Sequence, residues 1–260
     1  MENIDPNQIH LWFIHPAEIV DPRLLAEYWR MLSEEERARN ARFHLVRDSH
    51  RDLVTRAALR SLLSQYAAVA RPDWTFAPTV YGRPFLTNDD DLARRISFNI
   101  SHSEDRIVVA IAIDRLLGVD VERVMPIEDM EEVAKAFFSP QEVQALRGLP
   151  LAQRNARFLE YWTLKESYIK ACGQGLSLPL DKFWFQFPQA GTLQFNISND
   201  LDADAQRWLF WQIESVPDYL VAVCSNHGPS RIPEIMMRSY VPLLGEQQPI
   251  HGTVVRISAV

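Results

Sequence analysis

The order of hydrophobic and polar residues predicts a chain that begins with a strand and continues into helices. Residues 8–14 (QIHLWFI) alternate as a half-buried strand does, and Pro16 ends that pattern. Ser33 predicts a helix start, because Glu36 stands three residues later and completes a capping box. The stretch from residue 33 to 70 is rich in Arg, Ala and Leu and lacks Gly and Pro, which predicts one or two long helices.

Three strand-like runs follow a loop-like region over residues 71–95. The run at 96–100 (ISFNI) is short, whereas 107–113 (IVVAIAI) is continuously apolar, as is typical of a strand buried on both faces. Residues 118–122 (GVDVE) alternate again after a turn over 114–118. The last two runs are therefore predicted to form a hairpin.

Helical patterns return in the second half of the chain. The sequence of residues 139–142 (SPQE) combines an N-cap serine, a proline in the first turn and a glutamate at the third helical position. A stronger helix is predicted from about residue 152 to 172, and Gly173 ends it. From residue 183 onward, aromatic and β-branched residues alternate with polar ones, which predicts strands. Residues 241–260 are expected to form an appended tail.

Length and composition are those of a globular protein of one or two domains. The chain has 260 residues, and the 47% that are hydrophobic are sufficient for a core. Its net charge of −7 argues against a protein held to nucleic acid by bulk charge. The sequence has neither an apolar run of transmembrane length nor a secretory signal at its start. Only Cys172 and Cys224 are present, so we expect a cytoplasmic protein in a reducing compartment.

The first predicted helical stretch carries an excess of positive charge. Between residues 37 and 60, seven arginines face only Asp48 and Asp52, inside a chain whose net charge is −7. The arginines are Arg37, Arg39, Arg42, Arg47, Arg51, Arg56 and Arg60. A solvated helix face and a site for an anion or an acidic partner both explain this pattern, and the residues alone leave the choice open.

The sequence has no glycine-rich phosphate loop, zinc motif or nucleophile elbow, so its carboxylates are the first candidates for chemistry. Strand alternation places Asp120 and Glu122 on one face and Val119 and Val121 on the other. Neighbouring carboxylates repel each other unless a cation lies between them. Oxygen ligands suit Mg²⁺ or Mn²⁺, particularly when substrate phosphates complete the shell. An ordinary exposed strand end explains the pattern equally well.

A third carboxylate, Glu166, lies on the long helix predicted above. Helical geometry groups Phe158, Trp162 and Ile169 in one apolar stripe, with Glu166 at its border. Partial burial tunes a glutamate toward general-base chemistry. The alternative is a surface ion pair between Glu166 and Lys170, which lies one turn further along the helix.

Two shorter segments present polar groups next to predicted turns. Residues 99–103 (NISHS) place Ser101 and His102 just past a strand, where they can hold an anion or form a turn with local backbone bonds. Ser101 and His102 are not predicted to form a nucleophilic pair, because adjacent residues on an extended chain face apart. Residues 81–84 (YGRP) predict a tight turn that presents one cation, Arg83.

Taken together, these segments resemble the 4′-phosphopantetheinyl transferases of the surfactin synthetase-activating (Sfp) type. The matching segments keep their order and spacing, and the resemblance extends over residues 8 to 225 or so. The segments are FNISHS (98–103), GVDVE (118–122), FFS (137–139), WTLKESYIK (162–170) and GQGLSLPL (173–180). The combination of the second and fourth segments is the most specific part of the match.

The resemblance implies transfer of the phosphopantetheine arm of coenzyme A to a serine hydroxyl of an apo acyl or peptidyl carrier protein, with release of adenosine 3′,5′-bisphosphate. It implies that Asp120, Glu122 and Glu166 hold Mg²⁺, with Mn²⁺ as a second option, while the serine oxygen attacks the β-phosphorus. Glu166 would also help to deprotonate the serine. Lys170, and Lys165 as a second candidate, would contact the pyrophosphate. We expect a monomer with no nucleic-acid or membrane partner.

The same resemblance assigns the other end of coenzyme A. Arg39, Arg83, Ser101 and His102 match positions that hold its 3′-phosphate and adenine, and positive charge suits a phosphomonoester. The sequence departs from the family at Glu36, where relatives often carry a basic residue, and this departure weakens the expected phosphate contact from that helix. Arg83 stands where relatives often have lysine, which keeps the charge but changes the geometry.

The fold implied by the resemblance is α+β, with two similar α/β halves related by a pseudo-twofold axis. Each half would have a small antiparallel sheet and a long helix, and coenzyme A would lie in the cleft between the halves. We expect residues 1–115 to bind the adenine and 3′-phosphate, 116–230 to carry Mg²⁺ and the catalytic residues, and 231–260 to form a C-terminal extension. Two alternatives stay open: an inactive coenzyme A-binding relative and a Mg²⁺-dependent nucleotide pyrophosphate hydrolase.

Overall fold

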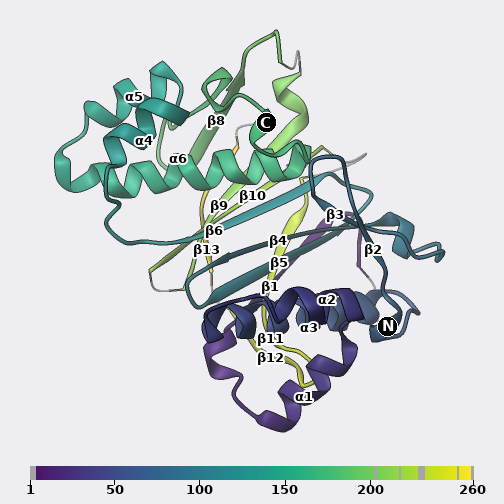
Figure 1. The fold of residues 1–260 in the computed structure, drawn as a ribbon. Helices are drawn as coiled ribbons and strands as arrows, with labels where there is room; N and C mark the ends of the chain where they lie inside the picture. Colours follow the sequence, from purple (N-terminus) through teal and green to yellow (C-terminus); the bar gives the residue numbers. More distant parts are fainter. Residues whose placement is uncertain (1–3, 202–203, 217, 228–231, 251, 259–260) are drawn as a thin grey trace.

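The protein has an α+β fold in which two sheets lie between two layers of helices (Figure 1). The computed structural model describes residues 4–201, 204–216, 218–227, 232–250 and 252–258. In that part of the chain no helix has the length and apolar character needed to cross a membrane.

The elements agree with most of the predicted ones. The helices are α1 (Pro22–Met31), α2 (Glu34–Asn40), α3 (Val46–Tyr66), α4 (Met130–Phe137), α5 (Pro140–Arg147) and α6 (Leu151–Cys172). The strands are β1 (Gln8–Ile14), β2 (Phe76–Pro78), β3 (Pro84–Leu86), β4 (Ile96–Ser103), β5 (Arg106–Ile113), β6 (Leu117–Arg123), β7 (Phe183–Gln186), β8 (Thr192–Ile197), β9 (Trp208–Val216), β10 (Tyr219–Asn226), β11 (Glu234–Val241), β12 (Gly245–Pro249) and β13 (Thr253–Ser258).

Local signals in the sequence set several of these boundaries. Ser33 and Ser139 each form the predicted capping box. The serine side chain accepts the backbone N–H of a glutamate three residues later, and that glutamate side chain accepts the backbone N–H of the serine. Gly173 ends α6 in the left-handed conformation, with φ of 69°, which glycine adopts at little cost. The predicted helix ends are thus confirmed, because each depends only on neighbouring residues.

The two large sheets have the orders β12-β11-β1-β5-β4 and β6-β10-β9-β13-β8-β7. Neighbouring strands are antiparallel except for the parallel pairs β1–β11 and β8–β13. Each parallel pair includes a strand that lies beyond residue 230. Each sheet is therefore mixed, whereas the resemblance implied purely antiparallel sheets.

The last strands are built into both sheets. Strand β11 pairs with β1 in the first sheet, and β13 lies between β8 and β9 in the second. The expectation of an appended tail over residues 241–260 is therefore wrong. The backbone groups of these residues complete the hydrogen bonding of strands that would otherwise have an open edge.

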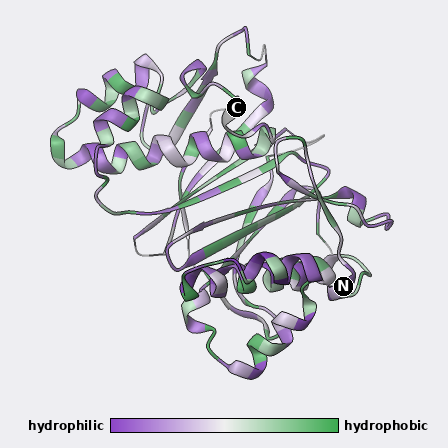
Figure 2. Ribbon diagram, viewed as in Figure 1, coloured by the Kyte–Doolittle hydropathy of each residue, from purple (hydrophilic) through white to green (hydrophobic). Residues whose placement is uncertain are grey.

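Three apolar clusters fill the spaces between the four layers. One lies between the first sheet and α1 and α3, one between the second sheet and α4 to α6, and one between the sheets. Strand β5 serves two of them: Ile107, Val109 and Ile111 face the helices, while Val108 and Ala110 face the other sheet. This confirms the prediction of a strand buried on both faces. In Figure 2 the helices mix hydrophobic and hydrophilic residues along their length, as amphipathic helices do.

The predicted hairpin is wrong, because β5 pairs with β4 and not with β6. Residues Ser103 and Arg106 close the β4–β5 hairpin, and β5 has β1 as its other neighbour. Strand β6 crosses to the second sheet and pairs with β10. The turn after β5 thus carries the chain from one sheet to the other.

Burial of His10 in the first sheet makes the stability of this half depend on pH. Its Nδ1 lies 2.8 Å from the hydroxyl oxygen of Tyr66, which also accepts a bond from Trp12 Nε1. Burial, and then the charge of Arg238, lowers the pKa of His10 to about 4. In the unfolded chain the imidazole takes up its proton near its ordinary value of 6.5. His10 therefore favours the folded state above that value, and this contribution is lost as the pH falls toward the folded pKa.

We predict that the free energy of unfolding of the wild-type protein falls more steeply with acid than that of His10→Gln. Between pH 6.5 and about 4, the wild-type protein should lose up to about 3 kcal/mol more unfolding free energy than the variant, which is the size expected for this pKa shift. Urea denaturation at several pH values measures it. Parallel pH profiles for the two proteins would contradict the assignment.

Candidate active site

Strands β4 and β6 are the edge strands of their sheets, and side chains join them. Three β4 side chains accept hydrogen bonds from backbone N–H groups of β6 at alternate positions. The bonds join Asn99 Oδ1 to Val119 N (2.9 Å), Ser101 Oγ to Val121 N (3.3 Å) and Ser103 Oγ to Arg123 N (3.1 Å). Because side chains alternate along a strand, Ile100 and His102 point to the other side of β4.

Helix α6 lies directly against β6, and a glycine allows this approach. A Cβ on Gly118 would lie 2.0 Å from the carbonyl oxygen of Ser167 and 2.5 Å from the backbone nitrogen of Ala171. No other residue type therefore fits at this position without moving the helix. The contact brings the turn of α6 that carries Glu166 and Lys170 onto the strand that carries the other acids.

Asp120 is the centre of a polar cluster between β4, β6 and α6. Its Oδ1 accepts hydrogen bonds from Lys170 Nζ (2.6 Å) and Ser101 Oγ (2.9 Å), and Lys170 Nζ also donates to Ser101 Oγ (2.9 Å). Lys170 thus pairs across to the strand, whereas its spacing in the sequence favoured a pair with Glu166. Ser101 is buried in this cluster, although the resemblance assigned it to the adenine end of coenzyme A.

Glu122 and Glu166 both lie where the charged form of a carboxyl group is disfavoured. Burial and then the charge of Asp120 raise the pKa of Glu122 to about 7, although bonds and charges from Ser103 and Lys170 act in the opposite direction. The same two causes raise the pKa of Glu166, and Lys170 again opposes them. The carboxyl groups on β6 and α6 are therefore close enough to repel one another, and a bound cation would relieve that repulsion.

The donor atoms of this cluster are those that Mg²⁺ prefers. Asp120 Oδ2 is buried and has no hydrogen-bond partner in the described part of the chain. Among the described residues, no three His, Cys, Asp or Glu side chains form a ready metal cage. Mg²⁺ usually takes one or two protein carboxylates and completes its shell with water and substrate phosphates. A few carboxylates, one of them with an oxygen that lacks a hydrogen-bond partner, therefore fit this cation.

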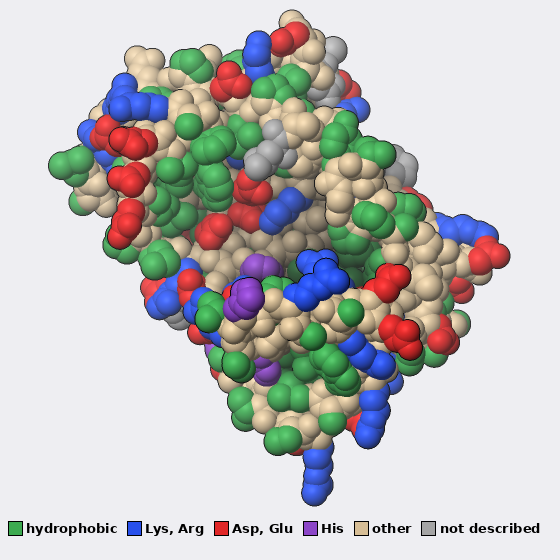
Figure 3. All heavy atoms as spheres, in the orientation of Figure 1, with side chains coloured by type: hydrophobic (Ala, Val, Ile, Leu, Met, Phe, Trp, Pro, Cys, Tyr) green, Lys and Arg blue, Asp and Glu red, His purple; other side chains and the backbone are tan. Residues whose placement is uncertain are grey.

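A cavity of about 730 Å³ opens on the other side of β4. Its walls combine apolar residues with several arginines. They come from α2, α3, β2, β4 and the segments that precede α3 and β2, and they include Arg39, Phe43, Arg51, Arg56, Trp74, Phe76, Ile100 and His102. Figure 3 shows a hollow in this face of the molecule, with acidic and basic side chains on one wall and histidines and basic side chains at the opposite rim.

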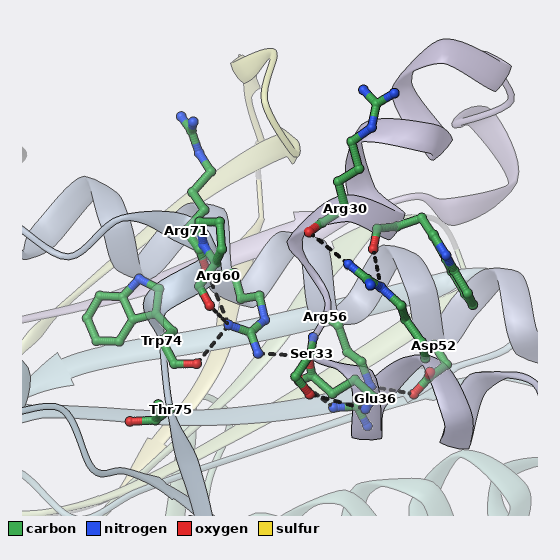
Figure 4. A network of polar contacts seen from close by, with 12 residues as sticks. Arg30, Ser33, Glu36, Asp52, Arg56, Arg60, Arg71, Trp74 and Thr75 are labelled. Carbon is green, nitrogen blue, oxygen red and sulfur yellow. Dashed lines mark hydrogen bonds and ion pairs between the residues drawn. The ribbon is translucent and has the colours of Figure 1, made fainter.

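Several arginines of the positive stretch are neutralised by Glu36 and nearby acids (Figure 4). Glu36 closes the capping box with Ser33 and also accepts Arg56 Nη1 at 3.0 Å and Arg60 Nη2 at 2.7 Å. Asp52 accepts Arg56 Nε at 3.0 Å. Glu36 lies just before residues 37–60, so the charge that is free to bind a ligand is smaller than the excess over that stretch. The acidic residue at the position where relatives are often basic thus holds two helices together.

Arg39 remains the best placed cation for an anion in the cavity. It is exposed, it lines the cavity, and no ion pair or hydrogen bond of its side chain is seen among the described contacts. Arg51 lies on the same cavity and pairs with Asp48 at 2.9 Å. Partial burial, followed by the charges of Arg51 and Lys170, lowers the pKa of His102. This imidazole is therefore neutral at pH 7 and offers hydrogen bonds to a ligand.

Comparison with known proteins identifies the family. The chain matches the family model "4'-phosphopantetheinyl transferase, N-terminal" over residues 22–114 and the "4'-phosphopantetheinyl transferase superfamily" model over 116–224. It is 34% identical over 217 residues to the 4'-phosphopantetheinyl transferase Sfp of Bacillus subtilis (strain 168), covering 84% of this chain and 92% of that protein. The chain belongs to the 4′-phosphopantetheinyl transferase superfamily. It is therefore an enzyme of the transferase class, as its motifs implied.

Two further relatives of this transferase carry the same description. The 4'-phosphopantetheinyl transferase HetI of Nostoc sp. (strain PCC 7120) is 36% identical over 171 residues, which cover 66% of this chain and 71% of that protein. The 4'-phosphopantetheinyl transferase gsp of Aneurinibacillus migulanus is 31% identical over 185 residues, with 71% and 74% coverage.

The proposed contact of Lys165 with pyrophosphate is wrong for this transferase. Lys165 is fully buried, and its Nζ lies 2.8 Å from Glu142 Oε2. It also donates to the carbonyl oxygens of Leu180 (2.7 Å) and Phe183 (2.6 Å). Burial lowers the pKa of Lys165, and Glu142 opposes this shift. Lys165 and Glu166 are adjacent in sequence, so helical geometry turns them in different directions.

Arg83 also has a different place from the predicted one. Its Nη1 donates to the carbonyl oxygens of Lys170 (2.9 Å) and Ala171 (3.0 Å), and its Nη2 donates to those of Leu117 (3.0 Å) and Phe98 (3.5 Å). The terminal N–H groups of the guanidinium are thus occupied, and only Nε remains. These contacts argue against a 3′-phosphate role and indicate that Arg83 ties the end of α6 to both edge strands.

Sequence reasoning did not single out Arg51 or Ser103. Arg51 is one of seven arginines in the positive stretch, and its sequence neighbours give no sign that it lines the cavity. Ser103 stood in the quoted FNISHS segment, and its spacing of two from Ser101 was an available signal, because residues two apart share a strand face.

We predict that Lys165→Met destabilises the protein strongly. Removing one partner of a buried ion pair leaves the other charge uncompensated, so the loss in unfolding free energy should be about 3–5 kcal/mol. The matched control is Lys182→Met, which breaks the exposed pair with Asp200 at 3.1 Å and should cost less than about 1 kcal/mol. Urea denaturation compares them, and equal losses would argue against a structural role for Lys165.

Proposed function

We propose that this protein transfers the 4′-phosphopantetheine moiety of coenzyme A to a serine hydroxyl of an apo acyl or peptidyl carrier protein and releases adenosine 3′,5′-bisphosphate. The observation that carries this proposal is the two-sided strand β4. Its Ser101 and Ser103 face the acids of β6, while Ile100 and His102 line the arginine-containing cavity. A ligand with phosphates at both ends of a nucleotide can contact the cavity and the polar cluster together.

The cavity is suited to the adenosine 3′-phosphate end of coenzyme A. Arg39 offers an exposed guanidinium to the phosphomonoester, and Arg51 supplies a second positive charge from α3. Apolar residues such as Phe76 and Ile100 lie on the same walls and can contact the base. His102, neutral at pH 7, can donate or accept one hydrogen bond.

The polar cluster is suited to the pyrophosphate and to Mg²⁺. Asp120 and Glu122 would hold the cation together with substrate phosphate oxygens, and Glu166 would complete the set from α6. Bound there, Mg²⁺ would act as a Lewis acid that neutralises charge on the phosphates. Mn²⁺ has similar oxygen preferences and stays an alternative. Lys170 Nζ, held by Asp120 and Ser101, adds a positive charge beside the reacting phosphates.

In the proposed transfer, one bond to phosphorus forms, one breaks, and the serine loses its proton. The carrier serine oxygen forms a bond to the β-phosphorus, and the bond from that phosphorus to the bridging oxygen breaks. The bridging oxygen leaves with adenosine 3′,5′-bisphosphate. Glu166 accepts the serine proton directly or through water, because burial and the charge of Asp120 raise the pKa of its carboxyl group and so make it a stronger base. Glu166 and Lys170 are thus the proposed catalytic residues.

The test is transfer to carrier proteins. The purified protein, incubated with coenzyme A, Mg²⁺ and a panel of apo carriers, should yield a carrier heavier by about 340 Da, the mass of one phosphopantetheine group, as expected of an Mg²⁺-assisted transfer. Intact-mass spectrometry reads this directly. Asp120→Ala should abolish the gain, whereas a coenzyme A-binding protein without activity would show no gain with any carrier. Release of phosphopantetheine without an acceptor would favour a pyrophosphate hydrolase. Monomeric state and cytoplasmic location stay predictions.

We predict that Arg39→Ala raises the KM for coenzyme A about ten-fold or more, as the loss of a charge-assisted bond to phosphate implies. The KM for 3′-dephospho-coenzyme A should not change, because that substrate lacks the phosphate that Arg39 would contact. Arg23→Ala, an exposed arginine of α1 outside the cavity, is the matched control. An equal rise in KM for both substrates would contradict the assignment.

A further inference from the structure

The β4 serines, Ser101 and Ser103, make the same pair of contacts with β6. Ser101 Oγ donates to Asp120 Oδ1, and Ser103 Oγ donates to Glu122 Oε2, both at 2.9 Å. Each serine oxygen also accepts the backbone N–H of the residue that follows its acid, Val121 or Arg123. The same motif therefore occurs twice, with a spacing of two residues on both strands.

A hydroxyl group is suited to this double contact. It carries one proton and two lone pairs, so the oxygen can accept from the backbone while its proton is directed to the carboxylate. Among the neutral side chains, only serine and threonine offer this combination on so short a stem. The backbone bond of β6 thus determines where the hydroxyl proton points.

The third side-chain to backbone bond between β4 and β6 has no acid beside it. Asn99 Oδ1 accepts the backbone N–H of Val119, and the preceding residue on β6 is Gly118, which has no carboxylate. A serine stands where β6 has an acid, and an asparagine stands where it has none. The Asn99 side chain therefore joins the strands in the same way without touching an acid.

Glu122 needs such a contact more than Asp120 does. Asp120 is held by Lys170 as well as by Ser101, whereas Ser103 supplies the hydrogen bond seen for the Glu122 carboxylate within the described contacts. The charge of Asp120 repels that of Glu122. Without a tether, the longer glutamate side chain would turn away from its neighbour.

We propose that Ser103 is a positioning residue for cation binding. It holds Glu122 Oε2 so that the carboxylate stays beside Asp120, with Oε1 left for the cation. The inference rests on the proposed function, because it takes Asp120 and Glu122 as ligands of the divalent cation. Ser103 acts through Glu122 and contacts neither substrate nor metal itself.

The test measures cation binding and not only activity. The full-length protein with saturating coenzyme A is titrated with Mn²⁺, and free Mn²⁺ is followed by electron paramagnetic resonance. Loss of a residue that orients a metal ligand typically weakens binding 10- to 100-fold. Ser103→Ala should therefore raise the Kd for Mn²⁺ about ten-fold or more, and Ser103→Thr should restore it. The KM for coenzyme A at saturating Mn²⁺ should stay unchanged.

Asn99→Ala is the matched control. It removes the hydrogen bond between Asn99 and the backbone of β6 without touching an acid. It should therefore lower the urea midpoint but leave the Kd for Mn²⁺ unchanged. An equal Kd in Ser103→Ala and wild type, or an equal loss in Asn99→Ala and Ser103→Ala, would overturn the inference. If Ser103→Ala does not fold, Ser103→Cys replaces it, since a thiol is a weak donor and acceptor and should show the same weakened binding.

The outcomes separate this inference from the proposed function. If the wild-type protein takes up no Mn²⁺ in the presence of coenzyme A, the metal assignment of Asp120 and Glu122 fails. If it takes up Mn²⁺ and the Ser103 variants bind it equally well, only the positioning role fails.

Discussion

The junction between β4 and β6 is the constraint on which the site depends. Each strand is the edge of its sheet, and backbone N–H groups buried there without partners would be costly. Asn99, Ser101 and Ser103 supply the acceptors for three of the β6 groups. Because side chains make these bonds, two of the residues that join the sheets, Ser101 and Ser103, also contact carboxylates of β6.

Close packing of α6 on β6 completes the arrangement. The helix backbone lies so near Gly118 that a Cβ would overlap it, and Arg83 ties the carbonyl oxygens at the end of the helix to both edge strands. Lys170 on α6 therefore pairs with Asp120 on β6. The position of the proposed catalytic side chains follows from backbone contacts between elements that are distant in the sequence.

The charges of the protein fall into two groups with different roles. Glu142 and Lys165 neutralise each other in the core beneath α6, and Glu36 neutralises Arg56 and Arg60. These pairs hold helices and strands together. The carboxyl groups of the polar cluster outnumber its single ammonium group, and Asp120 Oδ2 has no partner there. Such an unbalanced cluster is stable only with protons or a cation present.

The sequence by itself determined what depends on near neighbours. Capping boxes predicted the helix starts, Gly173 a helix end, and alternation the shared face of Asp120 and Glu122. Its motifs also indicated the family. Tertiary structure decided the partners: β6 pairs with β10, Lys170 with Asp120, and Lys165 with Glu142. The physical reason is that local periodicity tells which side of its own element a residue occupies. Packing between remote elements decides what lies opposite that side.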